Sequence, residues 1–427
     1  GLTVSRTALS AGLFIYDLLA RTPAAHRHKT LSASQAIAAE PQLKPAGLKG
    51  GAFYYDGHGD DARLTLENVL DAVLHGAAAA NYLVLTGFDK QAGKLKAAAV
   101  SDALTGDTFA IAARVFVNAA GPWVDDVRAM DEPGAHPVIR LTKGVHLMLD
   151  ARRLAVRNSL VLSDGQGRFV FVIRADDSIL LGTTDTDFNG ERGQVRVVPD
   201  DIDYLLQVVA RTLPGAALAH ADVVSGFAGL RALVAGDGTG PPSSVSREEL
   251  IISARSGMVS IAGGKLTTHR RIAQRVVDMI CHEIGRPEGE SPTLATPLPG
   301  ARPVASPEGH PGPIASSARA GLTARYGSRI ALIEALIDLD QQLGQPLSRG
   351  CPVLAAEAVH AARSEMAAKL EDFMVRRTTM ARRYPAQAQA AASRAAHLMG
   401  SELGWSATRE ASEVAEFTAA LKASRIV

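Results

Sequence analysis

The sequence contains only two cysteines, Cys281 and Cys351, and they stand far apart without metal-type spacing. Their scarcity excludes a disulfide framework and a cysteine-based zinc site, and it is typical of proteins from a reducing compartment. An excess of charge of one sign is also missing, since 45 Lys and Arg residues stand against 44 Asp and Glu residues. This balance gives no sign of a nucleic-acid-binding surface.

Long apolar runs are absent as well, and none approaches the ~20 residues that a membrane-spanning helix needs. An apolar stretch near the N-terminus, residues 8–20, contains Asp17, and Leu13, Tyr16 and Leu19 recur in it at helical spacing. This pattern predicts an amphipathic helix and not a signal peptide. We therefore expect a cytoplasmic protein with at most peripheral contact with the cytoplasmic membrane.

A change in composition divides the chain. After Pro292 the sequence holds repeated Pro and Gly steps, which cannot form a continuous helix, and from residue 316 it is Ala-rich and helical in pattern. We predict a region of mixed α and β structure over residues 1–298, a linker over 299–315 and an all-α C-terminal domain over 316–427.

The middle of the chain contains a series of segments with the sequence pattern of β-strands. Strand-like segments without intervening helices occupy residues 144–149, 159–162, 168–173 and 178–182. Closely spaced strands of this kind form antiparallel sheets. A helix over 200–212, capped by Asp200 or Asp201, is expected next. Further strands are expected over 223–234 and 250–261.

Residues 257–280 form a strand, a tight turn at Gly263 and Gly264, and a helix. Two glycines let the backbone turn sharply and let a ligand approach closely, while the first turn of the helix carries partial positive charge. Lys265 adds a full charge, so we expect an anion here. The alternative is an ordinary strand–helix connection with a surface lysine.

A second turn has similar character. An apolar strand over residues 115–117 ends in Ala119, Ala120 and Gly121, and a helix that starts with Pro122 follows. Small residues at this point would let a cofactor lie against the backbone.

Residues 359–383 carry an apolar helical face and end in four arginines, Arg376, Arg377, Arg382 and Arg383. Cations suit the C-terminus of a helix. We interpret these arginines as a solvated basic helix end and not as a site for a partner.

The order of these pieces resembles the FAD-dependent glycerol-3-phosphate dehydrogenases, which belong to the flavoproteins with a glutathione-reductase-type FAD domain. The resemblance runs from about Asp60 to Ala381. Its segments are DDARLTLENVLDA, VFVNAAGPWVDDV, IRLTKGVHLML, RFVFVIRADDSILLGTTDTDF, SGFAGLRALV, SREELI, SIAGGKLTTHRRIA and EMAAKLEDFMVRRTTMA. One such motif would be weak, but eight in family order are specific.

The resemblance implies a fold of combined α/β and α+β character. Parts of the FAD domain (about 57–125 and 250–285) would interleave with an antiparallel-sheet substrate domain (about 1–56 and 126–249). Family members open with a strand, a G-x-G-x-x-G turn and a helix that hold the FAD pyrophosphate, and neither this unit nor the His, Arg and Tyr segment after it occurs in residues 1–60. We expect either a truncated sequence or a protein that has lost its main grip on FAD, and in both cases weak FAD binding by these residues.

The resemblance also implies an activity, the oxidation of sn-glycerol 3-phosphate to dihydroxyacetone phosphate with FAD, and electron transfer to quinone in glycerol catabolism. Arg231 would hold the substrate phosphate or hydroxyl, Arg247 the phosphate, and Lys265 would lie between substrate and flavin. His146 is a candidate base. The cofactor-binding residues would be Ala120, Gly121, Pro122, Trp123, Gly263, Gly264, Lys265, Leu266, Thr267 and Thr268.

Each assignment has a plainer alternative. Arg231 read alone is an ion-paired surface arginine, and a lone strand histidine such as His146 is often structural. Asp185 and Asp187 could form a carboxylate pair, but we interpret them as residues that organise a turn by binding local N–H groups, and we predict no metal site. Alternatives for the whole chain are a non-catalytic remnant that serves as a binding module, and an oxidase that uses O2. A homodimer is a further expectation.

Overall fold

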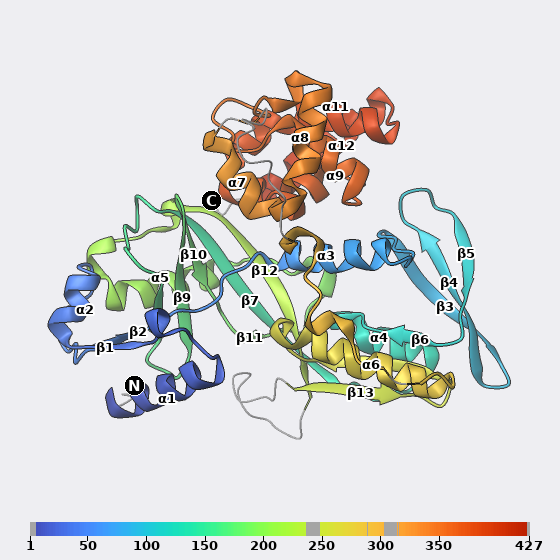
Figure 1. Ribbon diagram of the computed structural model, residues 1–427, viewed down its shortest axis with the longest axis horizontal. Coiled ribbons are helices and arrows are strands. Elements are labelled where there is room, and N and C mark those ends of the chain that lie inside the picture. The colour runs from blue at the N-terminus through green and yellow to red at the C-terminus, as the bar shows by residue number, and fades with distance from the viewer. Residues whose placement is uncertain (1–5, 236–247, 288, 303–313, 315, 425–427) are drawn as a thin grey trace.

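The computed structural model describes residues 6–235, 248–287, 289–302, 314 and 316–424 of the chain. It combines a region of mixed α and β structure with a C-terminal all-α region, as predicted. In the view of Figure 1 the C-terminal helices stack above the rest of the molecule, next to strand β12 and helix α3.

The largest sheet has six antiparallel strands within the described ranges. They are β7 Ile139–Asp150, β8 Leu160–Ser163, β9 Phe169–Ala175, β10 Ser178–Gly182, β11 Thr186–Asp187 and β12 Val223–Val234. Strand β12 pairs with nearly all of β7, and β10 and β11 pair with successive parts of the other edge of β7. The predicted antiparallel sheet is confirmed.

One face of this sheet is closed by helix α5 (Pro199–Thr212). Alternate residues of β7, namely Val145, Leu147 and Leu149, are buried and share a core with the apolar residues of α5. Burial of one Val or Leu side chain contributes roughly 1.5–3 kcal/mol, so this layer anchors the sheet.

Helix α5 begins earlier than the sequence pattern predicts. Its N-cap residue is Val198 and Pro199 is its first residue, so the predicted cap at Asp200 or Asp201 is wrong. The Asp201 carboxylate accepts a hydrogen bond from the Val198 N–H at 2.9 Å and forms an ion pair of 2.6 Å with Lys143 of β7. The acidic residue therefore joins α5 to the sheet from inside the first turn.

A second sheet contains three strands. β6 (Phe116–Asn118) runs parallel to β14 (Met258–Gly263), and β13 (Glu249–Ser253) pairs antiparallel with β14. The single strand predicted over 250–261 is thus a hairpin. Helices α3 (Asp61–Leu74), α4 (Val124–Asp131) and α6 (His269–Glu283) flank this region. A third sheet, β3 (Leu83–Gln91), β4 (Lys94–Asp102) and β5 (Thr108–Ala112), extends to the right in Figure 1.

The N-terminal segment begins with helix α1 (Arg6–Leu19), the amphipathic helix that the sequence predicts, and continues through β1 (Lys29–Leu31), α2 (Ala33–Ala39) and β2 (Gly51–Phe53). Asp17 faces inward and binds the His28 ring at 2.7 Å. Phe14, Leu18 and Leu19 are 63%, 68% and 79% exposed. Across the described ranges, no helix combines the length and the apolarity needed to cross a membrane.

The C-terminal helices are α7 Ser316–Tyr326, α8 Ile330–Leu339, α9 Ala355–Ser364, the π-helix η12 Asp372–Arg377, α10 Met380–Arg383, α11 Pro385–Leu403 and α12 Ala407–Ser424. The continuous helix that residues 359–383 suggest is wrong. Met366 and Thr379 have positive φ angles of 56° and 53°, a backbone region outside the right-handed helix, so the segment breaks into three parts. Its apolar residues still enter a common core with α11.

A buried ion pair fastens the C-terminal helices to α3. The Arg63 guanidinium contacts both oxygens of Glu365 and donates to the carbonyl of Arg377 at 3.1 Å. Burial alone would raise the pKa of Glu365, but His360 and Arg63 outweigh it and hold that pKa at about 2. The carboxylate therefore stays charged, and the pair fixes the C-terminal helices against the rest of the molecule.

Candidate functional site

The candidate site lies on the face of the large sheet opposite α5. Strand pairing sets Phe227 opposite His146, Gly229 opposite Gly144 and Arg231 opposite Thr142. Alternate residues of a strand share a face, so His146, Phe227 and Arg231 lie on one side while Val145 and its neighbours lie on the other. Sequence alone could not decide which way His146 faces.

Arg231 lies flat against this face. Its Nη1 donates to the carbonyl of Thr184 at 3.2 Å and lies 3.3 Å from Asp185, and its Nη2 donates to the Thr183 hydroxyl at 3.1 Å. A Cβ on Gly144 would come within 2.6 Å of Nη2, so glycine is required there. The side chain is 32% exposed. The guanidinium is therefore oriented by the protein, and about a third of the side chain stays exposed.

His146 is held by two neighbours. Its ring stacks on Phe227 with centroids 5.2 Å apart and an interplanar angle of 16°, and a Cβ on Gly182 would overlap the imidazole. Burial and the positive charge of Arg231 lower the pKa of His146 to about 4. The ring is therefore neutral near pH 7 and can accept a proton.

Open space separates these two side chains. Gly229 lies between Phe227 and Arg231 on β12, it is exposed, and a Cβ built on it would meet no atom within 4 Å. We call the open surface of the sheet at Gly229 the floor of the site. A histidine–phenylalanine stack borders it at one end and a guanidinium at the other.

The two small-residue turns that the sequence analysis singles out lie at the carboxyl ends of the parallel strands β6 and β14. Open α/β sheets bind ligands at this end of their strands. β6 leads into the 3-10 turn η2 (Gly121–Trp123), and β14 leads into η7 (Leu266–Thr268) and α6. Asn118 joins the two strand ends, because its amide donates to the Val124 carbonyl at 2.9 Å and to the Ser260 hydroxyl at 3.3 Å.

The surface of η2 and η7 leaves room for an apolar ring system to lie against the backbone. Gly121 has a φ of +55°, and a Cβ there would meet nothing within 4 Å. Trp123 and Leu266 are each 46% exposed. A ring system could therefore approach η2 and η7 without displacing protein atoms.

Gly263 and Gly264 form the sharp turn that the sequence predicts, and they have a packing role in addition. Both have left-handed backbone, with φ of +73° and +87°. A Cβ on Gly263 would lie 2.6 Å from Val234, and one on Gly264 would lie 2.7 Å from Ile272. Close packing of the turn against β12 and α6 therefore requires these glycines, in addition to any clearance for a ligand. The contact with Val234 also places the turn beside the end of β12 that carries Arg231.

The remaining predicted residues are placed as follows. Lys265 is exposed at the N-terminal boundary of η7, and in the described part of the chain no hydrogen bond or ion pair joins it to Arg231. Arg247 lies outside the described residues. Asp185 binds Arg231, and Asp187 binds Arg140 through two contacts of 2.6 Å. The interpretation of these aspartates as caps of local N–H groups is replaced by their role as partners of arginines.

The four tail arginines are not a solvated helix end. Arg376 pairs with Glu371 and Asp372, Arg377 donates to the carbonyl of Glu365, and Arg383 contacts Asp176 and Asp177. Arg382 lies over the ring of Phe227, with its Cζ 4.2 Å from the ring centroid. Sequence reasoning missed Arg382, because about 150 residues separate it from the strand that it touches and no local pattern reports such a contact.

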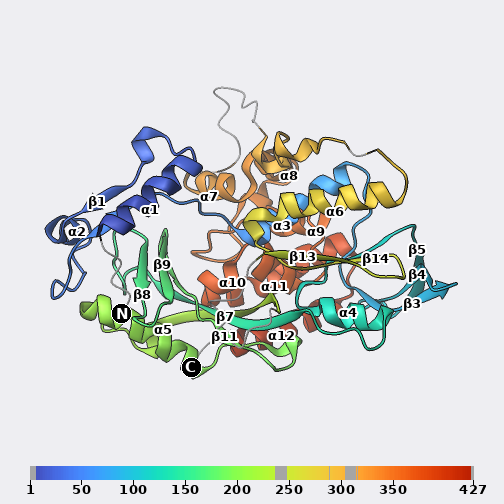
Figure 2. The same ribbon diagram turned by 90° about the horizontal axis from the view of Figure 1, so that it is seen from below.

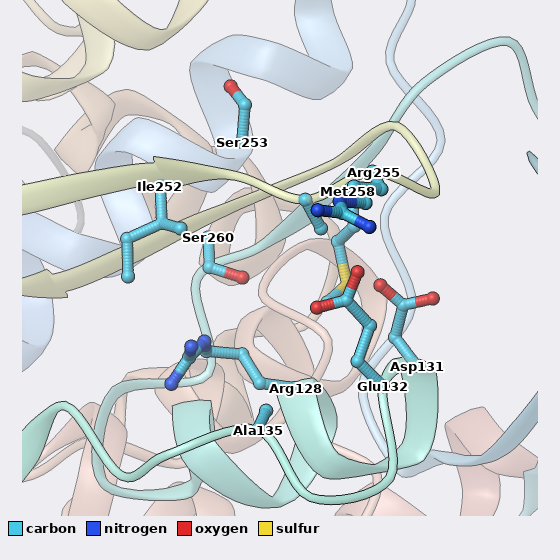
Figure 3. Close-up of a pocket in the computed structure, with 10 residues that line it drawn as sticks. Arg128, Asp131, Glu132, Ala135, Ile252, Ser253, Arg255, Met258 and Ser260 are labelled. Atoms are coloured by element: carbon cyan, nitrogen blue, oxygen red, sulfur yellow. The ribbon is translucent and has the colours of Figure 1, made fainter.

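Figure 3 shows a cavity of about 330 Å³ in a different place, between the end of α4 and the β13–β14 hairpin. The predicted site residues do not line it. Asp131 in its wall accepts a hydrogen bond from Ser256 at 2.5 Å and pairs with Lys90 at 2.8 Å. These contacts link β3, α4 and the hairpin, so Asp131 has a structural role there.

Comparison with known proteins identifies the family. The profile described as "FAD dependent oxidoreductase" matches residues 3–270, and the profile described as "C-terminal domain of alpha-glycerophosphate oxidase" matches residues 261–410. The chain is 33% identical to the aerobic glycerol-3-phosphate dehydrogenases of Staphylococcus haemolyticus, over 397 residues, and Bacillus subtilis, over 399 residues. Each alignment covers 88% of this chain and 70% of the relative.

A solved structure agrees with these relatives. The glycerol-3-phosphate dehydrogenase of Bacillus halodurans, solved in complex with FAD, superposes with a TM-score of 0.79 at 30% identity, over 92% of this chain and 79% of that one. The chain therefore belongs to the FAD-dependent oxidoreductases, in the glycerol-3-phosphate dehydrogenase family that its sequence motifs predict.

Proposed function

We propose that this chain oxidises sn-glycerol 3-phosphate to dihydroxyacetone phosphate with FAD as the first acceptor, and that the electrons then pass to quinone in glycerol catabolism. The observation that carries the proposal is the open floor at Gly229, with a neutral histidine and an oriented arginine around it. This floor lies on the strand whose far end contacts the Gly263 turn. FAD, when bound, supplies the acceptor for the hydride that leaves C2 of the substrate.

Arg231 is proposed to bind the substrate. Its planar fork is already held by Thr183, Thr184 and Asp185, so little conformational entropy is lost when the guanidinium binds an anion or a hydroxyl. Arg247 is proposed, from the family resemblance alone, as a further phosphate ligand. Lys265 is proposed to provide positive potential between substrate and flavin.

His146 is proposed to accept the proton of the C2 hydroxyl. Hydride loss from C2 requires that this proton leave as the carbonyl forms, and a neutral imidazole is the form that can accept it. The low pKa of about 4 keeps that form dominant at physiological pH. The stack with Phe227 fixes the orientation of the ring.

The turns η2 and η7 are proposed to hold the flavin ring. Ala120, Gly121, Pro122 and Trp123 would contact it from the β6 side, and residues 263–268 from the β14 side. The open space at Gly121 and the exposed Trp123 and Leu266 support this assignment. The G-x-G-x-x-G fingerprint of the pyrophosphate site is not found in the sequence, so flavin content has to be measured together with activity.

Further expectations concern location and assembly. The exposed Phe14, Leu18 and Leu19 of α1 support a peripheral contact with the cytoplasmic membrane, on which a quinone acceptor would be reached. In the structure these three side chains are not covered by described residues. A homodimer stays a prediction that light scattering would check.

The proposal is tested by purification of the protein in the presence of FAD and assay with sn-glycerol 3-phosphate. With excess FAD kept in the assay, the expected result is reduction of an artificial dye and a short-chain quinone, with dihydroxyacetone phosphate as product. A folded protein that leaves glycerol 3-phosphate unchanged at saturating FAD overturns it. Stoichiometric peroxide formation under air in place of quinone reduction would identify an oxidase.

A further inference from the structure

Among the four tail arginines, Arg382 differs from its neighbours. Arg376 and Arg383 pair with carboxylates, and Arg377 donates to a carbonyl. Within the described residues, Arg382 has no ion pair with a carboxylate, and its guanidinium instead lies over the face of Phe227. A cation–π contact leaves the N–H groups at the edge of the guanidinium directed outward, so they can bind an anion.

The backbone fixes this position. Helix α10 packs directly on strand β12, and the Ser225 hydroxyl donates a hydrogen bond to the carbonyl of Arg382 at 2.6 Å. The Arg63–Glu365 ion pair fastens the preceding segment to α3. Helix α10 packs against β12, and in Figure 2 it lies near the middle of the molecule. The backbone of Arg382 is therefore held against β12, and the segment before α10 is held against α3.

The spacing along β12 suits a small dianion. Phe227 and Arg231 are four residues apart, about 13 Å along a strand. The Arg231 guanidinium lies over Gly144, which pairs with Gly229. Gly229 is two residues from Phe227, so the distance along the strand between the guanidinium and Phe227 is only about 7 Å. Arg231 and Arg382 thus lie at opposite ends of the open floor, and His146 lies beside Arg382.

The electrostatics point the same way. Burial lowers the pKa of Arg382, and Asp61 and Asp60 at the start of α3 offset part of that effect without coming within ion-pair distance in the described structure. A buried guanidinium with its charge only partly compensated gains most from a doubly charged ligand.

We propose that Arg382 binds the phosphate of the substrate, so that the C-terminal helices complete the substrate site on β7 and β12. The inference rests on the proposed function, since glycerol 3-phosphate is the dianion in question. It assigns to Arg231 the glycerol hydroxyls, so that C2 lies between the two arginines, with His146 on the side of the phosphate. It also gives the C-terminal region a role in substrate specificity.

The test compares Arg382→Gln with Arg383→Gln, which removes the adjacent charge from the same helix. Isothermal titration calorimetry with glycerol 3-phosphate and with inorganic phosphate measures binding, and steady-state kinetics separates KM from kcat. For Arg382→Gln we expect Kd and KM to rise by about 10-fold or more while kcat changes by less than about 3-fold. Arg383→Gln is expected to keep the wild-type Kd.

Three results decide the matter. Equal Kd values for the wild type and Arg382→Gln, in proteins that unfold at the same temperature, overturn the inference but leave the proposed function intact. If Arg382→Gln does not fold, Arg382→Lys keeps the charge and the stem over Phe227 but loses the planar fork, and an unchanged Kd in that variant overturns the assignment. A wild type that binds phosphate but does not oxidise glycerol 3-phosphate overturns the proposed function, and the substrate role of Arg382 with it.

Discussion

The two faces of the large sheet are built from the same strands and have opposite properties. On the α5 side, Val145, Leu147 and Leu149 are buried in a continuous apolar core. On the other side, His146 and Arg231 border an exposed glycine with open space above it. The difference teaches that adjacent residues of β7 have separate tasks, because the strand period of two sends them to different faces.

The closed face also explains why the open one can exist. Polar and charged groups such as His146 and Arg231 add little to folding stability, so the core on the α5 side has to hold the strands in register. Register matters here, because a slip by one residue would exchange the two faces. The comparison therefore predicts that changes on the closed face alter stability and changes on the open face alter binding and catalysis.

The largest effect is expected from Leu147→Ala on the closed face. Deletion of this buried side chain leaves a cavity and should lower the free energy of unfolding by roughly 2–5 kcal/mol. Chemical denaturation measures the change. Val161→Ala, at an exposed position of the same sheet, is the control and should stay within about 0.5 kcal/mol of the wild type. Equal losses in both variants would contradict the assignment of the core to the α5 side.

On the open face, Arg231→Lys should lower kcat/KM for glycerol 3-phosphate by about 100-fold, equivalent to roughly 2.7 kcal/mol, because lysine keeps the charge and loses the planar fork. Arg153→Lys is the matched control, since Arg153 also pairs with an aspartate, Asp222, but beyond the opposite end of β7 and β12 from Arg231. Steady-state kinetics in both variants, with flavin content measured alongside, checks the expectation. A wild-type kcat/KM in Arg231→Lys would remove this residue from the site.

Gly144→Ala should have a smaller effect on the same quantity, about 10-fold in kcat/KM, because the new methyl group forces the Arg231 guanidinium off the sheet without removing it. Gly87→Ala is the control, since Gly87 is also a strand glycine but a Cβ there meets no atom within 4 Å. Identical kinetics for the two variants would show that Gly144 does not position Arg231.

The smallest effect is a titration. NMR of labelled histidine should find that His146 titrates near pH 4, and that Arg231→Gln moves its pKa upward toward the ordinary value of about 6.5. Since the folded pKa lies below the unfolded one, the unfolded state binds the proton first, and the native state loses stability as pH falls from about 6.5 to 4. A His146 pKa near 6.5 in the wild type would mean that the ring is neither buried nor influenced by Arg231.

Much of this arrangement could be predicted from the sequence. The spacing of strands 144–182 indicated an antiparallel sheet, and the Gly263 turn indicated strand, turn and helix, because both patterns are local. The motif context singled out Arg231 and His146. Their common face could not be predicted, because it depends on the register between β7 and β12, whose paired residues are about 80 positions apart.

Other features depend on tertiary contacts that leave no local trace. The positive φ angles at Met366 and Thr379, which break the predicted helix, occur at residues that give no turn signal. Arg382 resembles its neighbours in the sequence and differs from them only in what it touches. The exact packing of Gly263 against Val234 likewise requires two strands that are distant in the chain.

The most direct test of the central claim is to fill the open floor with Gly229→Leu. A Cβ at this position meets no protein atom within 4 Å and Gly229 is exposed, so we expect the variant to fold, and its unfolding temperature is measured beside that of the wild type. If glycerol 3-phosphate lies over Gly229, between Arg231 and His146, its Kd measured by calorimetry should rise by about 100-fold or more. A well-folded Gly229→Leu protein that binds glycerol 3-phosphate with the wild-type Kd would contradict the claim that this face is the substrate site.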